Sequence, residues 1–549
     1  MKNKFALISI IGLALASLTA CNLFDFLPNL DINGDGIHFS RQTTDISTPP
    51  PGDSVPHAAS VTYDDLVERS VYPMSNTPNL GTAKILVIPV WFNDSDSFIK
   101  TANRETVRSD IQKAYFGSNE DTGWRSVKTF YEEESFGAFT LEGTVSEWYE
   151  PGVGYSYYGV DKTSSEEDSR TSKLVKSATT WYFNNHSSDS RKNYDVDGDG
   201  YLDGVMLIYA APDYSASKKD SYTNLWAYCY WIQDPDVKNV TNPGANAYFW
   251  ASYDFMYGKE TISHTGYSYS SINKVPVGGD TSNCTLDTHT FIHEMGHMFG
   301  LEDYYDYSNY SYQPAGGFSM QDHNVGGHDP YSSFALGWGK AYVPIETTNI
   351  DLKPFALSGE MIILSPEWNA YNSPFDEYLI LEYYTNEGLN AFDNNHKYMS
   401  QYGKNYPTGS EISGIRLWHV DSRLVYTNSG SFSASKITTN PLINGQRVAL
   451  MMSNTYDDNK SDGYISILGS AYADYNLLQL IRSGTSYSHK TKEYFVANHL
   501  FYTGDTFTME KYGSQFVNKG KLNSKKDLGF SFTVNACNST YASITITKL

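Results

Sequence analysis

The sequence has few cysteines for its length, with 4 among 549 residues. Cys21 lies at the end of the N-terminal apolar run, which leaves Cys229, Cys284 and Cys537 in the rest of the chain. From these three, at most one intramolecular disulfide can form. Disulfide bridges are therefore excluded as the main source of stability.

Basic side chains are also scarce. The chain has 40 Lys and Arg against 62 Asp and Glu, a formal net charge of −22 at pH 7. Nucleic-acid binding requires clustered Lys and Arg facing phosphates, so we expect no nucleic-acid partner. An acidic balance favours solubility, calcium binding and a location outside the cell.

Long apolar runs are confined to the N-terminus. Residues 5–16 are apolar and follow two lysines, a pattern typical of a bacterial export signal and too short for a comfortable membrane span. The run ends in Leu-Thr-Ala-Cys at residues 18–21, which resembles a lipoprotein box. We predict a signal peptide over 1–20 and lipidation of Cys21, the alternative being an ordinary signal peptide with a chance cysteine. The lipid would then be the protein's sole contact with the membrane, at the cell surface.

Composition and hydrophobic pattern divide the remaining chain into three parts. Residues 21–80 are expected to be a polar flexible stalk, because their first forty are rich in Pro, Ser, Thr, Asp and Gly. Residues 81–344 alternate apolar strands (84–92, 137–147, 205–211) with helical spacing (107–115, 126–134, 173–184), which indicates an α/β catalytic domain. From 345 to 549 the pattern changes to short strands, including 377–382, 415–420, 529–534 and 541–547, and predicts a β-rich, sandwich-like domain.

The most informative motif is H-E-x-x-H at residues 293–297. On a helix, His293 and His297 leave the same face, about 6 Å apart along the axis. This geometry suits two nitrogen ligands of one zinc ion, with Glu294 beside them as the general base for a water activated by the metal. Asp287 or Thr288 can cap the start of this helix, and Gly300 can end it.

A third zinc ligand has to come from the chain after Gly300. Asp303 lies three residues beyond that glycine, with Glu302 and Asp306 as competing carboxylates. His289 stands one turn before His293 but about 12 Å from His297, too far to share one ion. We therefore expect His289 to be solvated or to lie outside the ligands.

An acidic segment at residues 195–203 has the spacing of a calcium loop. Asp195, Asp197, Asp199 and Asp203 occupy positions 1, 3, 5 and 9, and Tyr201 would offer its backbone carbonyl. Position 12 is a methionine, and the loop runs directly into an expected strand. We therefore expect structural rather than regulatory calcium, with an acidic turn lacking metal as the alternative.

A glycine-rich segment about twenty residues after the zinc motif contains Met320. In zinc peptidases with a long H-E-x-x-H-x-x-G motif, a methionine turn forms an apolar floor beneath the metal, and Met320 is the expected residue. His323 and His328 follow, and either is a candidate for hydrogen bonding to a substrate carbonyl.

These segments together resemble the immune inhibitor A family of secreted bacterial metallopeptidases. The resemblance is carried by residues 293–306, 195–200, 414–421 and 126–143. It implies a zincin-like catalytic fold, metzincin-like in its zinc helix and Met-turn, with zinc bound by His293, His297 and Asp303 and calcium in the acidic loop. Family members often carry a substantial folded pro-segment, whereas here a short polar stretch precedes the first strand.

The sequence therefore predicts a surface-anchored or secreted zinc endopeptidase that acts on extracellular proteins or peptides. The competing hypothesis is an inactive surface adhesin or glycan-binding protein on the same fold. Loss of Glu294 or of a zinc-motif histidine would be expected in such a protein, and all three are present.

Overall fold

The computed structural model describes most of the chain beyond its first 54 residues. The described residues are 55–68, 74–159, 169–213, 224–232, 234, 237–257, 268–269, 276–277, 286–308, 312–395, 409–427, 432, 434–456 and 472–549. The predicted signal peptide, Cys21 and the first part of the predicted stalk lie outside these residues. Within them, no helix combines the length and apolar character needed to cross a bilayer.

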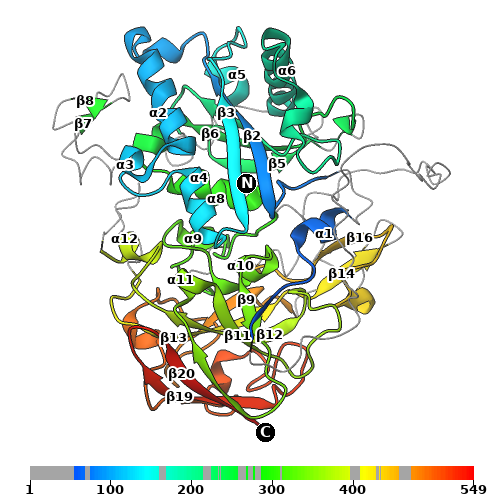
Figure 1. Cartoon of the computed structure of the whole chain (residues 1–549), viewed down its shortest axis with the longest axis vertical. Helices are drawn as coiled ribbons and strands as arrows, with labels where there is room; N and C mark the ends of the chain where they lie inside the picture. The colour runs from blue at the N-terminus through cyan, green and yellow to red at the C-terminus, as the bar shows by residue number, and fades with distance from the viewer. Residues whose placement is uncertain are drawn as a thin grey trace, which may run out of the picture.

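A five-stranded mixed sheet forms the framework of the N-terminal half, drawn uppermost in Figure 1. Four strands are parallel, and β5 pairs antiparallel with β6 at the edge. In sheet order the strands are β3 (Phe139–Val145), β2 (Gly81–Val90), β4 (Val205–Tyr209), β6 (Ala247–Ser252) and β5 (Tyr228–Trp231). This sheet and its helices confirm the mixed α/β character expected from the sequence.

Helices cover both faces of this sheet, because its strands are apolar on both sides. Along β2, Ile85 and Val87 join one hydrophobic cluster, whereas Leu86 and Ile88 join another. The first cluster includes side chains of α2 (Arg104–Phe116), α4 (Val127–Glu134) and α8 (His289–Met298). The second includes α6 (Arg170–Asn185), and the short helices of this half are α3 (Asn119–Thr122) and α5 (Tyr155–Gly159).

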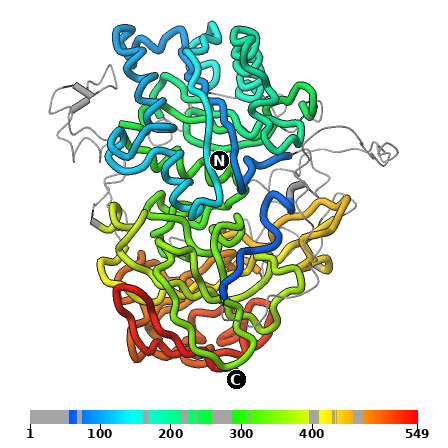
Figure 2. Tube along the Cα trace, viewed as in Figure 1, coloured from blue at the N-terminus to red at the C-terminus, as the bar shows by residue number. Residues whose placement is uncertain are grey.

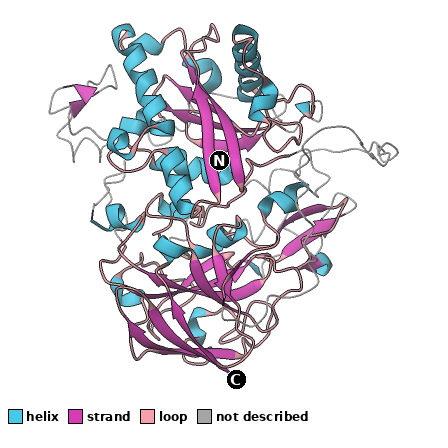
Figure 3. Cartoon of the chain, viewed as in Figure 1, coloured by secondary structure: helices cyan, strands magenta, loops and turns pink. Residues whose placement is uncertain are grey.

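The C-terminal half is rich in strands, as Figure 3 shows. Its six-stranded sheet has the order β1 (His57–Ala58), β9 (Lys340–Tyr342), β11 (Glu360–Leu364), β12 (Glu377–Tyr384), β13 (Gly414–Asp421) and β17 (Leu478–Ile481). A four-stranded sheet has the order β10 (Thr348–Leu352), β20 (Ala542–Lys548), β19 (Phe530–Cys537) and β18 (Thr506–Phe507).

Smaller elements complete the described chain. A three-stranded sheet has the order β15 (Ile437–Thr438), β14 (Leu424–Thr427) and β16 (Arg447–Leu450), and β7 (Ser268–Tyr269) pairs with β8 (Pro276–Val277). The short helices are α9 (Met320–His323), α10 (Pro330–Ala335), α11 (Phe355–Ser358) and α12 (Asn390–Asn395).

The six-stranded sheet is buried on both faces. Alternate residues of β13 separate the two environments: Leu417 packs toward the four-stranded sheet, and Trp418 belongs to the cluster that continues into the N-terminal half. That shared cluster contains α8 as well as side chains of β11, β12 and β17. The two halves are therefore joined by one continuous hydrophobic core.

The folded chain begins earlier than the predicted stalk allows. Residues 57–58 form β1 against β9, and α1 (Tyr63–Glu68) follows, so that the blue N-terminal segment runs along the β-rich half in Figure 2. Val61, Tyr63 and Leu66 are buried, and these few apolar residues provide the packing. The expected division at residue 344 differs as well, because β9 already belongs to the six-stranded sheet.

Candidate metal centre

Helix α8 lies between the two halves and carries both histidines of the motif (Figure 1). At its start, Asp287 Oδ1 accepts a hydrogen bond from the backbone amide of His289 (3.1 Å), whereas the Thr288 hydroxyl donates to the carbonyl of Arg125. At its end, Gly300 adopts a φ of 97°, a left-handed conformation that glycine tolerates. The chain turns there, as predicted, and returns toward the helix.

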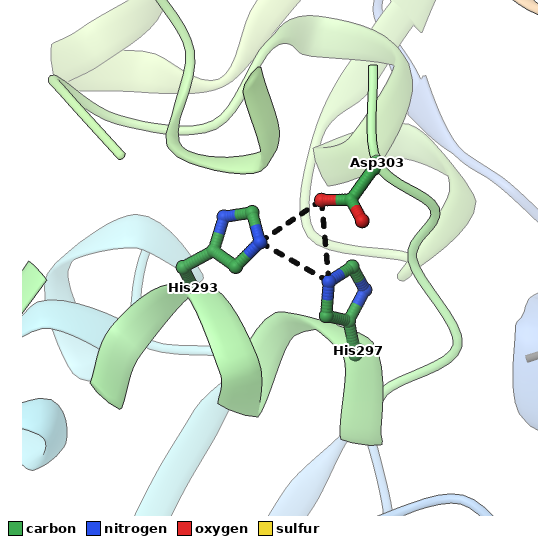
Figure 4. A group of neighbouring side chains, drawn as sticks. All are labelled: His293, His297 and Asp303. Carbon is green, nitrogen blue, oxygen red and sulfur yellow. Dashed lines mark hydrogen bonds and ion pairs between the residues drawn. The ribbon is translucent and has the colours of Figure 1, made fainter. Parts of the chain in front are cut away.

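This turn brings three side chains to one point (Figure 4). Asp303 Oδ1 lies 2.9 Å from His293 Nε2 and 3.3 Å from His297 Nε2. The two Nε2 atoms are 3.1 Å apart. The three predicted zinc ligands therefore lie together. Among the described residues, Asp303 rather than Glu302 or Asp306 completes the group.

Backbone carbonyls orient both imidazoles. Met320 O lies 2.8 Å from His293 Nδ1, and Leu301 O lies 2.7 Å from His297 Nδ1. A carbonyl can only accept, so each Nδ1 donates its proton there, and Nε2 is the nitrogen left to face a metal. This is the tautomer that a metal-binding histidine requires.

The carboxylate of Asp303 has one oxygen held and one available. The Tyr307 hydroxyl donates a hydrogen bond to Oδ2. Oδ1 is buried and faces the Nε2 atoms of His293 and His297. Burial raises the pKa of Asp303, but the neighbouring His297 and His293 outweigh burial and hold it below its ordinary value. Asp303 is thus ionised, and its Oδ1 is directed at the two histidines, as in a metal ligand.

The residues present fit a tetrahedral zinc site. Ligands about 2.0–2.1 Å from zinc lie roughly 3.3 Å from one another, close to the separations between the three ligand atoms. Three protein ligands leave the fourth position open, which is the arrangement of catalytic rather than structural zinc sites. The burial of all three side chains would also exclude competing bulk water.

Glu294 is positioned beside this group by the same helix turn. Its carboxylate accepts a hydrogen bond from the backbone amide of Cys229 in edge strand β5. Burial raises its pKa, opposed in part by His293 and His297. A carboxylate with a raised pKa takes up and releases a proton more readily near neutral pH, as a general base requires.

A close contact inside the motif fixes the helix against the following loop. A Cβ added at Gly296 would lie 2.2 Å from Gln321 Oε1, so no side chain fits there without movement. Gln321 Nε2 lies 3.5 Å from His297 Nδ1, and its side chain is buried. Neither Gln321 nor Tyr307 was predicted, although Tyr307 stands four residues after Asp303 in an aromatic segment.

His289 lies outside the group of candidate metal ligands, as expected, but it is buried rather than solvated. The side chain is buried and stacked on Trp124, with ring centroids 4.1 Å apart and planes at 7°. Its Nδ1 lies 2.9 Å from Asp287 Oδ1, and its Nε2 lies 3.3 Å from the carboxylate of Asp393 in α12. Sequence spacing placed His289 on the motif helix, but it could not identify Asp393, which lies 104 residues further along the chain.

The segment around Met320 contacts the site through its backbone. Met320 is buried, and its carbonyl is the acceptor for His293. His323 is partly exposed, with Nδ1 2.6 Å from Asp322 Oδ1. His328 is buried, neither ring nitrogen has a hydrogen-bond partner among the described residues, and burial lowers its pKa to about 3. Its ring packs among Phe130, Tyr131 and Trp338, and a role in binding substrate stays a prediction.

The acidic loop gathers three of its predicted ligands. Asp195, Asp197 and Asp203 each place a carboxylate oxygen within 4.8 Å of the others. Asp203 is held by the backbone amides of Lys84 (2.7 Å) and Val196 (2.9 Å). Burial raises the pKa of Asp197 to about 7, and repulsion from Asp199 and Asp195 adds to the shift. A cation in the loop would relieve that repulsion.

The other two predicted calcium ligands are less directly placed. Asp199 Oδ1 accepts from the amide of Tyr201 (2.8 Å), and Asp199 lies outside the three-carboxylate group. The carbonyl of Tyr201 stays a predicted ligand.

Comparison with known proteins gives the same assignment for the N-terminal half. Residues 75–320 match the family model described as immune inhibitor A peptidase M6, catalytic domain. A stretch of 212 residues (35% of this chain) is 24% identical to the pre-pro-metalloprotease PrtV of Vibrio cholerae serotype O1. A stretch of 200 residues (33% of this chain) is 24% identical to immune inhibitor A of Bacillus thuringiensis subsp. alesti.

The matches cover 20% of PrtV and 26% of the Bacillus protein, so the chain spans about a quarter or less of these relatives. They confirm the resemblance to the immune inhibitor A family and support the interpretation of residues 75–320 as a metallopeptidase domain.

Proposed function

Because residues 75–320 match a peptidase catalytic domain, we propose that the chain is a zinc-dependent endopeptidase that hydrolyses peptide bonds in extracellular proteins. The convergence of His293, His297 and Asp303 beside Glu294 is the observation that carries this proposal. An inactive binding protein would not need two imidazoles and an ionised carboxylate gathered at one buried point beside a glutamate.

Each residue has a defined chemical role. His293, His297 and Asp303 would hold zinc, which when bound polarises a scissile carbonyl and makes a water molecule more acidic. Glu294 accepts the proton of the attacking water and passes it to the leaving amine. The hydrogen bond from the Cys229 amide keeps the carboxylate of Glu294 aimed between the helix and strand β5.

Strand β5 offers a place for the substrate main chain. Among the described strands it pairs with β6 alone, and an extended peptide would pair with its other edge. Such pairing recognises backbone amides and carbonyls rather than a particular side chain. The substrate would then lie next to Glu294, whose carboxylate is bonded to the same strand.

Several finer assignments belong to this proposal. Met320 would form the Met-turn floor of a metzincin-like site, and Asp195, Asp197 and Asp203 would hold a structural calcium ion, with Asp199 and Tyr201 as further ligands. A zincin-like domain would be followed by a sandwich-like β domain that begins before β9. Export and lipid anchoring through Cys21 would place the enzyme at the cell surface.

Substitution of the general base tests the function. Glu294→Gln should retain zinc and the melting temperature but lose about 100- to 10,000-fold in turnover of a peptide library. Glu302→Gln is the matched control, because this buried neighbour lies outside the three-residue group and should keep its activity. A zinc-loaded Glu294→Gln protein with near wild-type turnover would exclude this mechanism.

A further inference from the structure

The two loops that complete the metal centre are both fastened to the C-terminal half. One loop, residues 314–320, ends at the carbonyl that orients His293. The other, residues 303–307, carries Asp303 and the tyrosine that holds it. Phe318, Met320 and Tyr304 pack in the core, and hydrogen bonds from the C-terminal half fix the backbone of both loops.

Arg416 of β13 anchors the first loop. Its Nη1 donates to the carbonyl of Phe318 (3.1 Å), two residues before Met320. Its Nε and Nη2 bind both oxygens of Glu382, directly opposite on β12, at 3.1 and 2.8 Å. Trp418 Nε1 also donates to this carboxylate (2.8 Å). The guanidinium is therefore fixed in a plane, with its remaining nitrogen, Nη1, directed at the loop.

Burying both charges of this ion pair costs desolvation energy, so stability alone does not explain the pair. The side chains of Arg416 and Glu382 are 4% and 1% exposed. The guanidinium carbon lies 4.6 Å from the ring centre of Tyr384 and 5.1 Å from that of Phe495. Buried ion pairs are often no more stabilising than apolar residues of the same volume, but they specify one geometry. Here the specified geometry includes the Phe318 carbonyl.

Asn454 anchors the second loop. Its Nδ2 donates to the carbonyl of Tyr304 (2.7 Å), next to Asp303, and to that of Leu478 (2.8 Å). Its Oδ1 accepts from the amide of Leu478 in β17 (3.0 Å). This fully buried amide thus joins the ligand loop to an edge of the six-stranded sheet.

The residues after Asn454 hold the same loop. Thr455 Oγ1 accepts from the amide of Tyr307 (3.2 Å), and the Tyr456 amide donates to Asp306 Oδ1 (3.2 Å). Backbone pairs connect the first loop in a similar way, with the amides of Leu480 and Phe495 donating to the carbonyls of Pro314 and Gly316. Both loops are therefore attached to the six-stranded sheet or to segments beside it.

We propose that Arg416 and Asn454 are positioning residues of the metal centre, so that the C-terminal β region completes a site whose ligands all lie before residue 304. The expected effect of these two residues on peptide hydrolysis rests on the proposed peptidase function. Their expected effect on zinc affinity does not. Loss of a group that orients metal ligands typically lowers affinity about 10- to 100-fold.

The test uses full-length variants that avoid leaving a buried charge alone. The double variant Arg416→Met with Glu382→Gln removes both charges and keeps an acceptor for Trp418. Asn454→Ala removes the second anchor and serves if the double variant does not fold. Zinc affinity by chelator competition, kcat and KM for a peptide, and the melting temperature are measured on each.

The chain contains a matched control on the same two strands. His419 Nε2 lies 2.9 Å from Glu377 Oε1, and this buried pair lies on the opposite face of β13, against the four-stranded sheet. The double variant His419→Met with Glu377→Gln should lower the melting temperature while leaving zinc affinity and kcat within about twofold of wild type.

The two anchor variants should instead lose about 10- to 100-fold in zinc affinity and lose kcat at saturating zinc, with KM little changed. If they lose only thermal stability, as the control does, Arg416 and Asn454 are ordinary core residues and the inference is wrong. A wild-type protein that binds zinc but hydrolyses no peptide would reject the peptidase function alone, since the affinity comparison still decides the positioning role.

Discussion

Replacing His289 by glutamine should change how the stability of this protein depends on pH. His289 lies between Asp287 and Asp393, the latter fully buried, and is stacked on Trp124. Burial lowers its pKa, but Asp393 and Asp287 outweigh burial and raise it to about 10. The folded protein therefore keeps this imidazolium at neutral pH, where an unfolded histidine with a pKa of about 6.5 is neutral.

The sign and size of the effect follow from these two pKa values. A raised pKa contributes stability that is fully present below about pH 6.5 and is lost as pH rises toward about 10. One extra proton bound by the folded state corresponds to a loss of about 1.4 kcal/mol per pH unit. The full contribution is on the order of 5 kcal/mol, within the roughly 3–5 kcal/mol lost when one partner of a buried pair is removed.

Urea unfolding of matched proteins between pH 6 and pH 9 measures this contribution. Both proteins carry Glu294→Gln, so that unfolded chains are not digested, and both are held at the same saturating zinc and calcium. The difference in unfolding free energy between the His289 protein and His289→Gln should be about 4–5 kcal/mol at pH 6. It should shrink by about 3 kcal/mol at pH 9. A gap that stays constant across this range would show that His289 is neutral in the folded protein.

Two further predictions concern the metal sites. Asp303→Ala should lose zinc affinity and activity together, by at least about 10- to 100-fold, while Glu302→Gln keeps both; metal analysis showing unchanged zinc in Asp303→Ala would overturn the ligand assignment. A chelator selective for calcium should reduce the free energy of unfolding by that of calcium binding, seen as a lower melting temperature. Zinc should stay bound, because the acidic loop and α8 are separate sites. An unchanged melting temperature would reject the loop as a calcium site.

Local patterns were sufficient to predict the main elements and the metal-binding helix. Four-residue spacing placed His293 and His297 on one face of α8, and Gly300 marked the turn that returns Asp303 to them. Continuous apolar runs predicted β2 and β4, and alternating residues predicted the pairing of β19 with β20. These signals succeed because hydrogen-bonding period and turn chemistry act between neighbours in the chain.

Contacts between distant segments left no comparable signal. Arg416 and Phe318 are 98 residues apart, and His289 and Asp393 are 104 apart, so neither pair could be assigned from spacing.

The early start of the fold was missed for another reason. Between residues 55 and 80, a small number of buried side chains such as Val61 and Tyr63 is diluted by polar neighbours, and composition averages conceal them.

Gly296 shows that the unspecified positions of H-E-x-x-H are not interchangeable in this protein. Glycine inside a helix costs about 1 kcal/mol relative to alanine, yet even a methyl group here would meet the buried amide of Gln321. Gln321 follows directly after Met320, so the missing side chain sets how closely the helix approaches the loop that orients His293. A designer who grafts the two histidines and the glutamate onto another helix would therefore also need to transfer this gap and the loop that fills it.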